Sequence, residues 1–67
     1  MLSKSMIDAL RQKYNANIAN ADTTINIYLK HPVAIGEHPQ HLEEIDKLVG
    51  TIAENKDKLQ VLEDFDG

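Results

Sequence analysis

The sequence contains no cysteine and no tryptophan, and it has only three glycines and two prolines. Without cysteine there are no disulfides, no thiolate metal ligands and no thiol nucleophile. No stretch approaches the roughly 20 consecutive apolar residues that span a bilayer. The first five residues lack the apolar run of a signal peptide, so we expect a cytoplasmic protein with no membrane segment.

The chain is also short, at 67 residues, of which 42% are hydrophobic. A domain of this size buries only about 60% of the surface that its unfolded chain exposes. Small domains usually compensate with disulfides, a structural metal or association. Because disulfides are excluded, we expect either self-association or a metal held by histidines and carboxylates.

Charge is distributed unevenly along the chain. Residues 1–35 hold four basic and two acidic residues, whereas residues 36–67 hold three basic and nine acidic ones, and the net charge is −4. Two such halves attract when they lie side by side, within one chain or between chains. The negative total argues against a general nucleic-acid binder, and binding through Lys4, Arg11 and Lys13 is the weakest hypothesis.

Apolar residues recur every three or four positions between about residues 5 and 30, which is typical of one helix face. They are Ile7, Leu10, Tyr14, Ile18, Ala21, Ile25 and Tyr28. We expect Ser5 to cap this helix and Pro32 to end it near Lys30. Residues 24–29 alternate like a strand, but a lone strand has nothing to pair with, so a helix is favoured.

A second helix is predicted over about residues 39–64, with Pro39 as its first residue and His38 as its cap. Its apolar face holds Leu42, Ile45, Leu48, Ile52, Leu59 and Leu62. Residues 31–38 form the turn between the helices. Within it, Val33 and Ile35 are expected to cover the open end of the helix pair.

An antiparallel pairing of these helices brings together residues whose numbers add up to about 72. This register pairs Ile7 with Phe65, Leu10 with Leu62, Ala21 with Gly50, and Asn17 with Asn55. A small residue at Ala21 and Gly50 would let the backbones approach closely. The two asparagines either form a buried polar pair that fixes the register, or both face water.

A single hairpin leaves several large apolar residues in water. They are Ile27, Leu29, Leu42, Val49 and Val61. The fold class predicted is therefore all-α, a single antiparallel two-helix hairpin that forms a homodimeric four-helix bundle or a higher homo-oligomer.

The densest group of reactive side chains lies near the turn. His38, His41 and Glu44 follow one another at steps of three residues and resemble a set of ligands for a Zn²⁺-like ion. Pro39 interrupts this set, and capping or solvated histidines explain it equally. Neither Ser3 nor Ser5 has a histidine nearby in sequence to complete a catalytic relay, so we predict no enzymatic activity and no cofactor. A non-enzymatic interaction or structural protein is the leading hypothesis, and a metal-binding protein is the alternative.

The central segment carries a resemblance. Residues 28–39, with the turn Pro-Val-Ala-Ile-Gly-Glu-His-Pro, and residues 42–47 after them are similar to small uncharacterised helical proteins of marine T4-like bacteriophages. The resemblance covers about the middle third of the chain. It implies a setting in an infected bacterial cell or a virion, and it assigns no functional residue.

Overall fold

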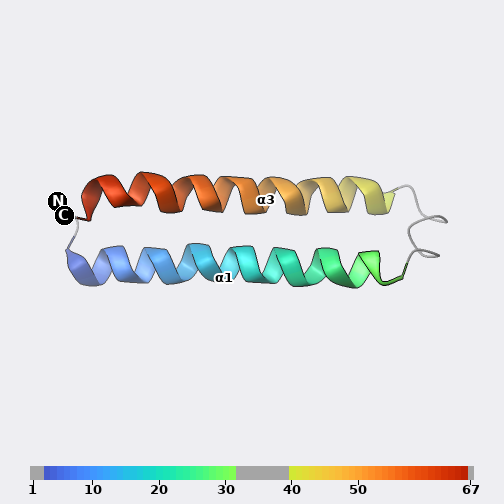
Figure 1. The fold of residues 1–67 in the computed structure, drawn as a ribbon, viewed down its shortest axis with the longest axis horizontal. Coiled ribbons are helices and arrows are strands. Elements are labelled where there is room, and N and C mark those ends of the chain that lie inside the picture. Colours follow the sequence, from blue (N-terminus) through green and yellow to red (C-terminus); the bar gives the residue numbers. More distant parts are fainter. Residues whose placement is uncertain (1–2, 32–39, 67) are drawn as a thin grey trace.

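The computed structural model describes residues 3–31 and 40–66, and within these ranges it consists of helices only. Helix α1 spans Lys4–Leu29, helix α3 spans Gln40–Leu62, and a short 3-10 helix, η1, follows at Glu63–Phe65. The two long helices lie side by side and run in opposite directions, so that α1 begins where η1 ends (Figure 1). This arrangement confirms the all-α hairpin, and residues 24–29 are helical rather than extended. Residues 32–39, with the predicted cap and the turn's apolar residues, lie outside the described ranges.

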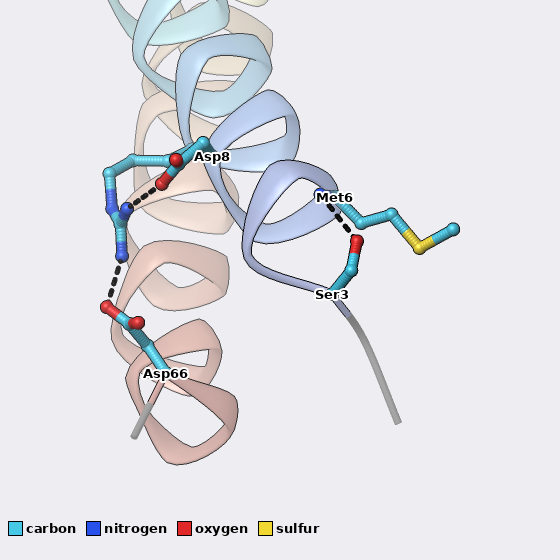
Figure 2. A network of polar contacts seen from close by, with 5 residues as sticks. Ser3, Met6, Asp8 and Asp66 are labelled. Atoms are coloured by element: carbon cyan, nitrogen blue, oxygen red, sulfur yellow. Dashed lines mark hydrogen bonds and ion pairs between the residues drawn. The ribbon is translucent and has the colours of Figure 1, made fainter.

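The amino end of α1 is capped by Ser3, not by Ser5 as the sequence predicted. The Ser3 side-chain oxygen accepts a hydrogen bond from the Met6 N–H at 3.2 Å (Figure 2). Its carbonyl accepts from the Ile7 N–H at 3.0 Å. The Ser3 carbonyl thus accepts the first regular bond of the helix, and its side chain satisfies the Met6 N–H, which otherwise lacks a partner within the helix.

Helix α1 continues without a break through its polar segment, residues 20–26. Asparagine, aspartate and threonine are weak helix formers because their side chains compete for backbone hydrogen bonds. Here two of them instead bond back along the helix. The Thr24 hydroxyl donates to the Asn20 carbonyl, and the Asn26 amide donates to the Asp22 carbonyl, both at 2.9 Å. The helix then ends at Leu29, just before Pro32 as predicted.

The interface between α1 and α3, here called the seam, repeats in alternating steps of three and four residues. In α1 it contains Ile7, Leu10, Tyr14, Asn17, Ala21, Thr24 and Tyr28, and in α3 it contains His41, Ile45, Leu48, Ile52, Asn55, Leu59 and Leu62. This is the 3.5-residue period of helices that coil around each other. The core is thin, because only Ile7, Ala21, Asn55 and Leu62 are buried among the described residues.

The pairing of Ala21 with Gly50 is wrong. A Cβ atom added at Gly50 would meet no atom within 4 Å, so this glycine faces open space. The next residue, Thr51, lies with Ala21 around one hollow instead. Position 50 lies midway between the seam residues Leu48 and Ile52, about 200° around the helix from each, so it faces away from α1. Phe65, expected opposite Ile7, keeps 58% of its surface exposed.

The hairpin is long and exposes an unusually large surface for its size. Its extents are 49 × 14 × 11 Å, and its radius of gyration is 15.3 Å, against about 11 Å for a compact domain of this length. Its accessible surface is 5,119 Å², whereas a compact monomer of its mass exposes about 4,250 Å². The hairpin thus exposes about 870 Å² more than a compact monomer would.

Candidate interaction surfaces

A polar pair lies at the middle of the seam. The Asn17 Nδ2 donates to the Asn55 Oδ1 at 3.0 Å, and the Asn55 Nδ2 donates to the Thr51 carbonyl at 2.7 Å. Asn55 is only 3% exposed, and these two hydrogen bonds satisfy both the oxygen and the nitrogen of its buried side-chain amide. The predicted polar pair is confirmed. Shifting one helix along the other would separate the two amides, so the pair favours a single register.

Near the termini, Arg11 joins the two arms of the hairpin. Its guanidinium contacts the Asp8 carboxylate at 3.0 Å and the Asp66 carboxylate at 2.9 Å. Figure 2 shows these two carboxylates on either side of one basic side chain. All three side chains are more than one-third exposed, so the interaction contributes about 1 kcal/mol or less. Since both carboxylates neutralise Arg11, the basic set of Lys4, Arg11 and Lys13 is weakened as a phosphate-binding surface.

A shallow groove of about 260 Å³ lies at the same end, and we call it the terminal groove. It is lined by Leu10, Tyr14, Asp57, Lys58, Val61, Leu62 and Phe65. The Lys58 ammonium lies 5.5 Å from the centre of the Tyr14 ring and 3.4 Å from a Glu54 carboxylate oxygen. This groove was not predicted from the sequence. Two features of the sequence could have indicated it. Val61 is an apolar residue outside the apolar face, and the numbers of Tyr14 and Lys58 add up to 72, which places these two residues opposite each other in the predicted register.

A second hollow of about 220 Å³ lies on the same flank of the seam. It is lined by Asn17, Asn20, Ala21, Thr24, Leu48 and Thr51. Thr51 and Lys58 are seven residues apart in α3, which places them on one side of the helix. Each directly precedes a seam residue. This flank is therefore polar near its middle and apolar at the terminal groove.

The opposite flank, which we call the apolar flank, carries large β-branched or leucine side chains that directly follow seam residues, and we define it by four of them. They are Ile18 and Ile25 from α1, and Leu42 and Val49 from α3. Leu42 is 63% exposed and Val49 is 51% exposed. The sequence predicted that five apolar residues of a single hairpin would remain exposed, namely Ile27, Leu29, Leu42, Val49 and Val61. All five are at least half exposed.

The predicted metal ligands are only partly described. The His41 ring packs against Tyr28, with ring centres 5.1 Å apart, and the Glu44 carboxylate lies 3.5 Å from the Lys47 ammonium. His38 lies outside the described residues. Within residues 3–31 and 40–66, no group of three histidines or carboxylates is placed to hold a metal ion. The set of His38, His41 and Glu44 stays a prediction.

Comparison with known protein families, with curated proteins and with solved structures gives no match to this chain. The resemblance to phage proteins therefore stays a prediction. Neither described helix combines the length and the apolarity needed to cross a membrane.

Proposed function

We propose that this chain is a non-enzymatic interaction protein, in which two copies of the hairpin pair through their apolar flanks to form a four-helix bundle. The bundle then serves as a rigid helical module that contacts other proteins. The observation that carries this proposal is the thinness of the core. Three apolar residues are buried within the described hairpin, whereas Leu42 and Val49 on the apolar flank are 63% and 51% exposed.

The size of the exposed surface supports a second copy as the partner. The excess of about 870 Å² per chain matches the roughly 800 Å² that each partner buries in a standard protein–protein interface. A two-fold pair buries the same patch on both copies, which suits a flank to which both α1 and α3 contribute apolar residues. The opposite charges of the two halves of the sequence favour placing α1 of one copy beside α3 of the other.

The lining of the grooves supports a role in binding rather than in catalysis. Apart from Tyr14, only Asp57 and Lys58 are ionisable in the terminal groove, and Lys58 is paired with Glu54. The smaller hollow is lined by amides, hydroxyls and two apolar residues. Surfaces of this kind supply hydrogen bonds and apolar contacts to a partner.

Two valines of α3 allow a matched test. Val49 lies on the apolar flank and is 51% exposed, and Val61 lies on the groove flank and is 50% exposed. Sedimentation equilibrium should give the wild type a mass of twice 7.5 kDa at micromolar concentration. Val49→Asp would place a carboxylate in the interface and should weaken pairing by about 100-fold or more, equivalent to about 2.7 kcal/mol. Val61→Asp should leave the dimer intact.

Circular dichroism of both variants checks that the helices persist. A folded wild type with the mass of one chain would refute the proposal. Equal loss of pairing in both variants would refute the assignment to the apolar flank, and a mass above two chains would replace the dimer by a larger assembly.

A further inference from the structure

We propose that the terminal groove binds a basic amphipathic helix of another protein. One apolar side chain of that helix enters the groove, and its lysine or arginine side chains meet the carboxylates around the rim. This site is distinct from the apolar flank that the proposed function assigns to a second copy.

The shape of the groove indicates a helical occupant. One wall of the groove comes from α3 and η1. Its lining residues there lie three, four and seven positions after Lys58, and they are Val61, Leu62 and Phe65. That spacing forms a stripe along the helix axis, and α1 supplies the facing wall. A channel between two parallel or antiparallel helices accommodates the apolar face of a third.

The groove offers an apolar anchoring position. Val61 and Phe65 are 50% and 58% exposed beside the half-buried Leu10 and Tyr14. A bulky apolar side chain placed there would remove all four from water. Clusters of aromatic and aliphatic side chains at the centre of an interface carry most of its binding energy.

The charges around the groove indicate a basic partner. Two of the cations nearby are already engaged, because Lys58 pairs with Glu54 and Arg11 pairs with Asp8 and Asp66, whereas Lys13 forms no ion pair with any described residue. Three further carboxylates form no ion pair with any described residue. They are Asp57, which lines the groove, and Glu63 and Asp64, which stand between the lining residues Leu62 and Phe65. An approaching cation would find them accessible, and an acidic partner would be repelled.

A peptide in the terminal groove and a second copy on the apolar flank can bind at the same time. The terminal groove and the apolar flank lie on opposite sides of the seam. A dimer paired through the apolar flanks therefore presents two such grooves, one per copy. Binding at the groove is expected to be unchanged by substitutions that break the dimer.

The test uses a designed peptide of about 18 residues, long enough to form a helix, with lysines on one face and leucines around a single tryptophan on the other. The 67-residue chain has no tryptophan, so tryptophan emission reports the peptide alone. Titration with the protein should shift this emission to shorter wavelength and saturate. A matched peptide with glutamate in place of lysine should bind at least about tenfold more weakly.

Val61→Asp separates anchoring from simple charge attraction. The substitution adds a negative charge, which would strengthen a purely electrostatic contact, but it should weaken lysine-peptide binding at least about tenfold because the anchor position is lost. Val49→Asp should bind the peptide as the wild type does. Asp57→Lys, at an exposed position, should weaken the lysine peptide and strengthen the glutamate peptide.

Circular dichroism confirms that each variant is folded. Absence of saturable binding by the wild type, equal binding of both peptides, or undiminished binding by Val61→Asp would each overturn the assignment. Loss of self-association in Val61→Asp would show instead that a second copy occupies the groove.

Discussion

Replacing Asn55 by alanine is the sharpest test of the seam. The substitution removes the hydrogen bonds to Asn17 and to the Thr51 carbonyl, and each contributes about 1 kcal/mol. Alanine is a better helix former than asparagine, which raises the free energy of unfolding by about 0.5 kcal/mol. We therefore expect the free energy of unfolding to fall by about 1.5 kcal/mol. Asn15→Ala is the matched control. Asn15 is exposed on α1, so this substitution should only add the helix-propensity gain of about 0.5 kcal/mol to the free energy of unfolding.

The two variants should thus change stability in opposite directions. Urea unfolding followed by circular dichroism measures both, at one fixed protein concentration because association also contributes to stability. A double-mutant cycle with Asn17→Ala should give a coupling of about 1 kcal/mol between the two asparagines. If Asn55→Ala stabilises the protein as Asn15→Ala does, the buried pair does not exist as described.

Three further outcomes follow from the structure. Ser3→Ala should lower the free energy of unfolding by about 1 kcal/mol because the cap to Met6 is lost, whereas Ser5→Ala should change it far less; equal losses in urea unfolding would contradict the assigned cap. Gly50→Ala should stabilise the protein by about 1 kcal/mol, because a Cβ meets no atom within 4 Å, and a lower thermal midpoint would show that position 50 is in contact. Adding Zn²⁺ or a chelator should leave the thermal midpoint unchanged, since the His41 ring packs on Tyr28, and a zinc-dependent rise would support the metal site instead.

The sequence predicted the hairpin and its register because both depend on repeating patterns. Apolar residues at steps of three and four define the facing sides of the helices, and one number near 72 relates the two sides. That relation placed Asn17 opposite Asn55, and the hydrogen bond between them confirms it. Four of the five exposed apolar residues lie off the predicted apolar faces. Leu42 was placed on one of these faces, but the seam takes His41 in its place and Leu42 is 63% exposed.

The details that were missed depend on geometry that a regular period does not contain. Ser3 and Ser5 are equally suitable caps in sequence, and the choice rests on which serine reaches an amide of the first turn. Gly50 lies two positions from the seam residues Leu48 and Ile52, and on a helix that offset turns a residue away from the partner helix. Phe65 belongs to a 3-10 helix with about three residues per turn, so its direction departs from that expected for an α-helix, and the terminal groove depends on it.

Dependence of thermal unfolding on protein concentration tests the central claim most directly. If a second copy covers the apolar flank, the midpoint must rise as the protein is concentrated, because unfolding then also separates two chains. Val49→Asp should abolish this dependence, and Val61→Asp should preserve it. A wild-type midpoint that stays constant over a hundredfold dilution would show that the thin seam is stable alone, and the proposed bundle would be wrong.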